Sequence, residues 1–328
     1  MATNLQAATV GDEVMAYLVL KNIQISNANA ISGMTWGFPA VSHFLGFVHA
    51  LSRHTERSEF GFSLDACAIV CNQHQVHAHR ENAYEPYAFS LTRNPLTKEG
   101  KTAPIVEEGR MHLTVSLVIE CNGVNRVTDD MERAQSDFVK RLAERNKLAG
   151  GTITDIGACY FSDEPHAKLL RRLLPGFILV DRSQYLAEQN EQCNESALQN
   201  WLDFSALKYQ ATDTPLSAEE HKESPKVEWQ RVKSSFDGYL VPIQIGYKKI
   251  APTYAAGDVA NTRDNDTPVS FVEAIYSVGE WVGSPSRLTS MQQALWQHAY
   301  RDPFYVCHTQ SQLSANVDPI DLDDDFLE

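Results

Sequence analysis

The sequence of 328 residues has no long apolar run, no CxxC motif and no excess of basic side chains. A membrane-spanning helix needs about 20 consecutive apolar residues, so we expect no membrane segment. The N-terminus MATNLQAATVGDEV lacks a basic segment followed by an apolar one, and therefore no secretory signal peptide is expected. The six cysteines are dispersed, which favours reduced thiols in a cytoplasmic protein over a disulfide framework.

The net charge of −14 argues against a nucleic-acid partner, because phosphate binding needs basic side chains. This charge is unevenly distributed, however. Residues 181–228 hold ten acidic and four basic side chains, and residues 318–328 hold six acidic and no basic ones. These two segments carry −12 of the −14, so the rest of the chain is nearly neutral and has room for a basic face. Charge alone neither establishes nor excludes an RNA partner.

The stretch 17–51 predicts a strand, a polar loop and a helix. Apolar residues at odd positions from Tyr17 to Ile25, with Lys21 as the exception, are typical of a strand. The loop over 26–37 is rich in amides and glycine, and is where we expect function. Pro39 suits the first position of the helix. The helix is expected to bury one apolar face, formed by Phe38, Val41, Phe44, Leu45, Val48 and Leu51.

Two more strands and a second helix follow. Residues 64–80 predict a strand or hairpin arm. Its alternating histidines point to one face, which is expected to be solvated. Their spacing fits no standard zinc pattern. Residues 111–120 alternate apolar and polar side chains and predict the cleanest strand. Asp129 and Asp130 are good N-cap residues for a helix to about Leu148, with Met131, Ala134, Phe138 and Leu142 on the buried face. The glycine pair at 150–151 ends that helix, and an extended segment starts at Thr152.

The order β-α-β-β-α-β predicts an α+β fold with a ferredoxin-like or RRM-like core over residues 1–180. Residues 84–110 contain three prolines and predict a long hairpin or loop excursion from that core. Residues 181–235 predict a helical and mobile insertion, because they are largely polar and punctuated by proline. Residues 236–317 are expected to complete the body as an α/β extension. This extension has strands at 239–245 and 269–276 and a helix after Thr289 that buries Met291, Leu295, Trp296 and Ala299. Residues 318–328 read as an acidic tail.

Several stretches together resemble the second subunit of the Csy complex, the type I-F CRISPR RNA-guided surveillance complex. They are NANAISGMTWGFPAVSHFLGFVHAL at 27–51, LTRNPLTKEGKTAPIVEEGRMHLTVSL at 91–117, KLAGG at 147–151, RRLLPGFILV at 171–180, GYLVPI at 238–243 and RDNDTPVSFVEAIYSVGEWV at 263–282. Residues 181–235 and the acidic tail lie outside these blocks.

The resemblance implies a non-catalytic member of the RAMP superfamily with a ferredoxin-like core. Such a subunit caps the 5′ handle of the CRISPR RNA, pairs with the large subunit that recognises the target DNA, and adjoins the first backbone subunit. No membrane contact, cofactor, metal ligand or catalytic residue is expected.

The residues themselves indicate where single-stranded RNA binds, because such RNA is held by stacking, by amide and guanidinium donors and by basic or backbone contacts to phosphate. In a ferredoxin-like order the first strand is central, so its loop lies near the segment after the second helix. The candidate RNA-binding residues are Asn27, Asn29 and Trp36 in the first loop, Arg93, Asn94 and Arg110 at the excursion, Lys147, Gly150 and Gly151 after the second helix, and Arg171 and Arg172.

Each candidate also has a structural interpretation. Trp36 is as consistent with packing in the core as with stacking on a base. The glycine pair is equally consistent with a helix stop, and the excursion with a solvated loop. Arg171 and Arg172 are adjacent and cannot share one helical face, so one can bind phosphate while the other pairs locally.

Two other functions remain open. A metal-independent endoribonuclease needs a histidine general base, and His43 and His49 lie on the first predicted helix. Both border apolar positions, which favours a place beside the core over an acid–base pair. A scaffold without RNA contact is favoured by the net acidity.

Overall fold

The computed structural model describes residues 16–89, 91–93, 96–212, 228–232, 234–262 and 264–313. Its largest feature is a ten-stranded sheet in the order β10-β11-β1-β9-β4-β12-β16-β15-β18-β17, and its neighbouring strands pair antiparallel. Few helices accompany this sheet. The mixed α and β architecture expected from the sequence is therefore confirmed.

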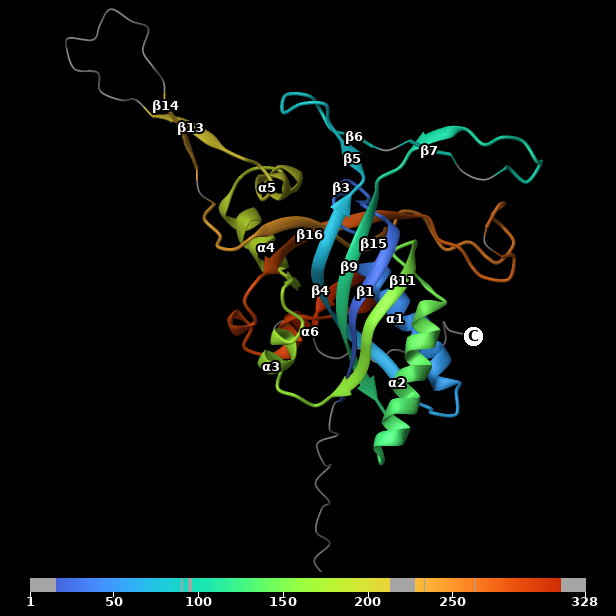
Figure 1. Cartoon of the computed structure of the whole chain (residues 1–328). Coiled ribbons are helices and arrows are strands. Elements are labelled where there is room, and N and C mark those ends of the chain that lie inside the picture. Colours follow the sequence, from blue (N-terminus) through green and yellow to red (C-terminus); the bar gives the residue numbers. More distant parts are fainter. Residues whose placement is uncertain are drawn as a thin grey trace, which may run out of the picture.

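Four strands of this sheet and two helices form the part of the fold that positions the candidate site (Figure 1). Along the chain they are β1 (Ala16–Asn29), α1 (Val41–Glu56), β4 (Ser63–Val76), β9 (Arg110–Asn122), α2 (Asp129–Glu144) and β11 (Gly151–Ser162). Their strands lie in the order β11-β1-β9-β4, so β1 and β9 are central. The predicted order β-α-β-β-α-β is observed.

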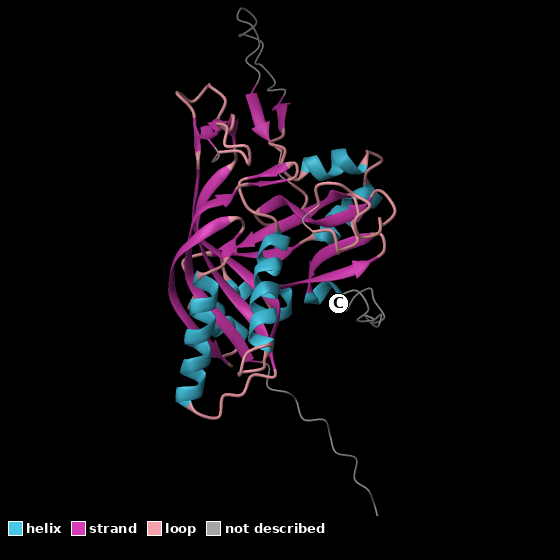
Figure 2. Ribbon diagram, turned by 90° about the vertical axis from the view of Figure 1, so that its right-hand side faces the viewer, coloured by secondary structure: helices cyan, strands magenta, loops and turns pink. Residues whose placement is uncertain are grey.

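The two helices pack side by side on one face of these strands, the inner face (Figure 2). The core there joins apolar side chains of β1 and β9 to those of α1, among them Ile23, Leu117 and Phe44, which are fully buried. The opposite, outer face divides into two halves. In its covered half, Val19 and Val118 are buried beneath α3 (His166–Arg171) and neighbouring segments. The other half, the open half, carries polar side chains and a groove.

β1 does not keep the strict alternation that its odd positions predicted. The β1–β9 pairing shifts between Leu20 and Ile23, and Asn22 within this bulge has a φ of 54°. The backbone N–H of Asn22 donates to Ser116 Oγ at 3.0 Å. A bulge moves the following side chains to the other face, so Leu18 and Leu20 share the inner core with Ile23 and Ile25.

Both helices of the core begin differently from the prediction. α1 starts at Val41 with Ala40 as its N-cap, so Pro39 precedes the helix instead of occupying its first position. α2 is capped by Thr128, whose hydroxyl accepts from the Met131 amide at 3.2 Å, and not by an aspartate.

The predicted face of α1 is confirmed from Val41 to Leu51, whereas the face of α2 was assigned wrongly in part. Met131 and Ala134 are exposed, and Phe138 and Leu142 are only partly buried. The buried face of α2 consists of Gln135, Ser136, Val139 and Ala143. The helix also ends at Glu144, four residues before the predicted end, and the chain then forms the short strand β10 (Lys147–Leu148).

The C-terminal strands extend the sheet and fold back on it. β12 (Phe177–Asp181), β16 (Val272–Val282), β15 (Leu240–Lys249), β18 (Phe304–Thr309) and β17 (Leu295–Arg301) follow β4 in this order. β17 pairs with β4 again, at Leu295 with Ala68 and Trp296 with Cys67. The pairings therefore close a ring of six strands, and α1 contacts both the core strands and β15 and β17.

The helix predicted after Thr289 is wrong. The segment has a 3-10 turn, η2 (Met291–Gln293), and then enters β17. Trp296 is fully buried and its indole N–H donates to the Leu179 carbonyl at 2.8 Å. The 3–4 spacing of the apolar residues is therefore satisfied by a turn followed by a paired strand, because strand pairing with β4 and β18 outweighs local helical propensity.

The remaining elements are short. β5 (Ala78–His79) precedes the excursion and pairs with β6 (Ala88–Phe89) within it. The excursion also contains β7 (Leu91–Arg93) and β8 (Ile105–Glu107), which pair as a hairpin. The first loop contains the pair β2 (Ile31–Ser32) and β3 (Thr35–Trp36). The insertion contains α4 (Ser183–Gln192), α5 (Ala197–Asp203), β13 (Tyr209–Thr212) and β14 (Glu228–Arg231). The others are η1 (Pro285–Arg287) and α6 (Gln310–Leu313).

Residues 213–227 of the insertion predicted over 181–235 lie outside the described residues, as does the acidic tail. The described helices of the insertion are tied to β16. Glu280 is fully buried between Arg182 and Arg287, at 2.7 Å from each guanidinium. The Trp201 indole donates to the Ser277 carbonyl at 2.9 Å. A buried carboxylate is tolerated only with such partners.

The six cysteines are free, and four of them are buried: Cys67, Cys71, Cys121 and Cys307. Burial raises the pKa of the Cys121 thiol to about 12, which keeps it protonated at neutral pH. Among the helices that the structure describes, none has both the length and the apolar character needed to cross a membrane.

Candidate nucleic-acid interface

Most predicted RNA-binding residues come together where the C-terminal end of β1 meets the start of β9 and β11. Asn29 pairs with Arg110 across the β1–β9 ladder. The backbone N–H of Asn29 donates to the Ala149 carbonyl at 2.8 Å, which ties the β10–β11 turn to β1. Asn27 and Asn29 were expected in the first loop but lie in β1, because the strand continues to Asn29 by pairing with β9. The end of β1 and the segment after the second helix are thus adjacent, as the predicted strand order requires.

Asn27 and Arg110 form the centre of this group. A second bulge in β1 places Asn27 at φ 57°, exposed to solvent. The backbone carbonyl of Asn27 accepts from Arg110 Nη1 at 3.5 Å, and its backbone N–H donates to His112 Nδ1 at 3.4 Å. The Arg110 guanidinium also pairs with Glu108, at 2.7 Å from Nε and 2.6 Å from Nη2. A phosphate at Arg110 therefore has to compete with this carboxylate.

The two glycines of the β10–β11 turn differ in their surroundings. Gly150 is exposed with φ 75°, and a Cβ placed there would lie 3.9 Å from Arg110 Nη1. Gly151 is buried, and its Cβ would lie 2.6 Å from Ile25 Cγ2 and 2.8 Å from the Ala28 amide nitrogen. Gly151 therefore lets β11 approach β1, whereas Gly150 leaves open surface beside Arg110.

Asn29 and Trp36 have distinct environments. The Asn29 side chain bonds locally, since its Nδ2 donates to the Ile31 carbonyl at 2.8 Å and its Oδ1 accepts from the Ile31 amide at 3.3 Å. Trp36 is 45% exposed, so it does not belong to the core. Its ring centroid lies 5.6 Å from that of Phe89 in the excursion. Part of the indole is therefore open to solvent beside Phe89.

The basic pair at the end of α3 lies apart from this group. Arg172 Nη2 pairs with Glu164 at 2.7 Å, and the Arg172 carbonyl accepts from Lys21 Nζ at 2.7 Å. Arg171 is exposed and has no ion pair among the described residues. One arginine therefore pairs locally, as expected from their adjacency. Arg93 lies in β7, Lys147 is exposed in β10, and Asn94 lies outside the described residues.

A polar row that no sequence motif indicated crosses the open half. Asp155, Gln24, Thr114 and Gln73 occupy paired positions on β11, β1, β9 and β4. Gln24, Thr114 and Gln73 line a groove of about 780 Å³, whose lining also includes His112. A signal was present, because each strand changes from apolar to polar residues on this face. Its meaning appears only when the strands are placed in register.

Histidines gather at one end of the same groove. The ring centroids of His77 and His112 lie 4.2 Å apart in an edge-to-face contact. Burial, and secondly the neighbouring His112, lower the pKa of His77. In the described part of the chain, no group of three or more His, Cys, Asp or Glu side chains is arranged to hold a metal ion.

The two histidines considered for catalysis have unlike environments on α1. His43 is partly buried, its Nδ1 has no hydrogen-bond partner in the structure, and burial lowers its pKa. His49 is exposed. A general acid and a general base must both reach the same substrate group, and nothing in this arrangement favours such a pair.

The strand order and the polar, amide-rich surface define a protein of α+β class with a candidate binding face for single-stranded nucleic acid. A protein-family model described as "CRISPR-associated protein (Cas_Csy2)" matches residues 18–307. The chain is also similar to "CRISPR-associated protein Csy2" of Pseudomonas aeruginosa (strain UCBPP-PA14). The two are 38% identical over 305 residues, which cover 86% of this chain and 91% of that protein.

The chain belongs to the Csy2 family of CRISPR-associated proteins. The resemblance to the second subunit of the type I-F Csy complex is confirmed. The match also spans residues 181–235, which lie outside the stretches that carried the resemblance.

Proposed function

We propose that the chain is a non-catalytic RNA-binding subunit that caps the 5′ handle of the CRISPR RNA in a type I-F complex. The contact between the end of β1 and the β10–β11 turn carries this proposal. It brings Asn27, Arg110, Lys147 and Gly150 onto one surface, with amide, guanidinium and ammonium donors beside an exposed glycine. These are the groups that hold a single-stranded backbone.

The polar row extends this surface across the open half. Gln24, Thr114 and Gln73 offer uncharged donors and acceptors, which suit the edges of unpaired bases. The order β11-β1-β9-β4 supports a ferredoxin-like core of the RAMP type beneath this surface. Arg171 and Arg172 remain a separate candidate for a phosphate contact.

The partners follow from the same proposal. The chain pairs with the large subunit of the complex, adjoins the first backbone subunit, lies near the target DNA and is cytoplasmic. The near-neutral body supports an RNA site that a basic neighbour completes. The isolated chain should bind handle RNA weakly, and the pair with the large subunit much more tightly. Equal affinity of the two would contradict this completion.

Arg110→Ala in that pair tests the RNA site. The substitution should weaken handle binding and make the slope of log affinity against log salt shallower by roughly 0.7, the value per phosphate for a single strand. Arg133→Ala is the matched control, because Arg133 is exposed on α2 away from this surface. If Arg110→Ala leaves both affinity and slope unchanged while the fold is intact by circular dichroism, the RNA site lies elsewhere.

The endoribonuclease alternative makes the opposite prediction for cleavage. We expect the purified chain to leave repeat RNA intact with and without divalent metal, because His43 and His49 form no acid–base pair. Specific scission that His43→Ala or His49→Ala abolishes would establish the alternative. A scaffold without RNA contact would show no salt-dependent handle binding in either the chain or the pair.

A further inference from the structure

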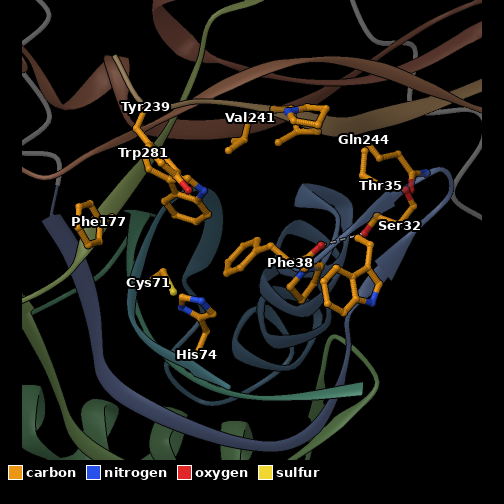
Figure 3. A pocket seen from close by; sticks show the side chains of 15 residues that line it. Ser32, Thr35, Phe38, Cys71, His74, Phe177, Tyr239, Val241, Gln244 and Trp281 are labelled. Carbon is orange, nitrogen blue, oxygen red and sulfur yellow. Dashed lines mark hydrogen bonds between the residues drawn. The ribbon is translucent and has the colours of Figure 1, made fainter. Parts of the chain in front are cut away.

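An aromatic cleft of about 430 Å³ lies between the start of α1 and strands β4, β12, β15 and β16. Figure 3 shows its side chains, with Phe38 and Trp281 facing the cavity from different elements. Among the residues that the structure describes, no Asp, Glu, Lys or Arg side chain lines it. A cavity of this composition accepts a flat, uncharged group and disfavours a phosphate.

One wall of the cleft is rigid. The Phe38 ring stacks on Phe44 with centroids 5.6 Å apart and meets Trp281 edge-on at 4.8 Å. The rim, in contrast, is accessible, since Phe177 is 55% and Tyr239 is 70% exposed. A fixed aromatic wall behind exposed rings is suited to enclosing another ring, because offset and edge-to-face pairs are the favoured aromatic geometries.

The polar side chains of Ser32, Thr35 and Gln244 lie on one side of the cleft in Figure 3. The Thr35 hydroxyl donates to the Ser32 carbonyl at 2.8 Å, and the Ser32 hydroxyl donates to the Phe38 carbonyl at 3.3 Å. Both hydroxyl oxygens retain lone pairs. They can accept from the amino or imino group of a heterocycle, which an aliphatic side chain does not offer.

The cleft adjoins the groove of the open half at β4 and β12, because the two cavities share lining residues there. Cys71, His74 and Phe177 border both the cleft and the groove that holds the polar row. A strand of RNA that follows the groove therefore reaches the rim of the cleft at these residues. Its backbone can stay in the groove while one base turns into the cavity.

We propose that the aromatic cleft takes a single unstacked nucleobase of the single-stranded RNA that lies along the open half. This inference rests on the proposed RNA-binding function and adds a site for one base. Aromatic walls provide stacking that tolerates every base, and the hydroxyl and amide groups contact its polar edge. An apolar side chain of a partner protein is the competing occupant, and the test distinguishes the two.

The test uses the chain paired with the large subunit and a set of handle RNAs, each with one abasic site at a different position. Val241→Trp fills the cleft, since Val241 lines it from β15. Val272→Trp is the matched control, because Val272 is exposed on β16 outside the cleft. Val241→Trp should weaken binding of intact RNA roughly tenfold, the scale of losing one stacked base, and Val272→Trp should not.

One abasic position should cause the same loss with the unsubstituted pair and no further loss with Val241→Trp. Such a double-mutant cycle isolates the coupling between cleft and base. Phe177→Ala, at the exposed rim, should couple to the same position and serves where Val241→Trp fails to fold. Phe271→Ala is its control, 48% exposed and away from the cleft.

RNA binding that survives with no abasic position coupled to either variant would overturn the nucleobase site and leave the proposed function standing. Loss of the large subunit on Val241→Trp without RNA present would instead identify a protein side chain as the occupant, and would also overturn it. If the unsubstituted pair does not bind handle RNA at all, both this inference and the proposed function are wrong.

Discussion

The covered and open halves of the outer face use the same three strands for opposite purposes. In the covered half, Val19, Val118 and Ala68 form a paired row that is fully buried. In the open half, Gln24, Thr114 and Gln73 form the corresponding row on the same face. The bulge at Asn22 lies between the two rows on β1.

This difference supports the proposal that the open half binds a ligand. A sheet face that packs on the core carries apolar side chains, and α3 with β12 and β17 supplies the cover in the covered half. The open half keeps β-structure but replaces apolar side chains with amides, a hydroxyl and imidazoles around the groove. Uncharged polar groups on a rigid sheet suit recognition of bases more than the capture of phosphates alone.

The largest expected effect separates the two rows by stability. Val118→Asp buries an unpaired carboxylate and should lower the free energy of unfolding by about 4 kcal/mol. Thr114→Asp places the same group at a solvated position and should cost less than about 1 kcal/mol. Urea unfolding followed by circular dichroism measures both. Equal losses would mean that the halves do not differ in cover.

The glycine pair sharpens the comparison between packing and open surface. Gly151→Ala brings a methyl group against Ile25 and the β1 backbone, and should cost about 2 kcal/mol of unfolding free energy. Gly150→Ala meets no close neighbour, and its φ of 75° alone should cost about 1 kcal/mol. The same denaturation assay compares them. A larger loss at Gly150 would contradict the packing role assigned to Gly151.

A smaller effect concerns Arg110 at the edge of the open half. Glu108→Gln removes the carboxylate that pairs with the guanidinium, and so frees it for phosphate. A partly exposed ion pair contributes up to about 1 kcal/mol, so handle RNA should bind about two- to fivefold more tightly. Fluorescence anisotropy with the pair of subunits measures the affinity. Weaker binding of Glu108→Gln would show that Glu108 itself contacts RNA.

The smallest effect is a pH dependence of stability that arises from His43 on α1, the helix that packs on the inner face. Burial lowers the pKa of His43 below its ordinary value of about 6.5. The unfolded chain therefore binds a proton more readily, and stability should fall as pH drops through about 6.5 towards the folded pKa. His43→Gln should flatten this part of the profile of thermal midpoint against pH. An unchanged profile would assign the dependence to other groups.

Much of this core could be predicted from the sequence, because local patterning and tertiary packing agree there. Residues 111–120 alternate cleanly, and the side chains at their odd positions, Met111 to Ile119, all face the helices in β9. The segment that holds Gly150 and the end of the first strand are expected to be neighbours from strand order alone, and the Asn29–Ala149 hydrogen bond joins them.

Prediction failed where pairing overrides local pattern. Residues 289–299 have helical spacing but form a turn and a strand, since Trp296 needs the partners that β4 and β18 provide. The bulge in β1 reverses the side chains after Asn22, which periodicity alone does not reveal. The polar row and the aromatic cleft each combine residues from several strands, so neither forms a motif along the chain.

The most direct test of the open half as an RNA surface is photo-crosslinking of handle RNA that carries 4-thiouridine, within the assembled pair of subunits, followed by mass spectrometry. If RNA lies along the open half, crosslinks are expected to peptides that contain Gln24, Gln73, Arg110 or Thr114. Crosslinks confined to the exposed sides of α1 and α2, with none on the outer face, would contradict it.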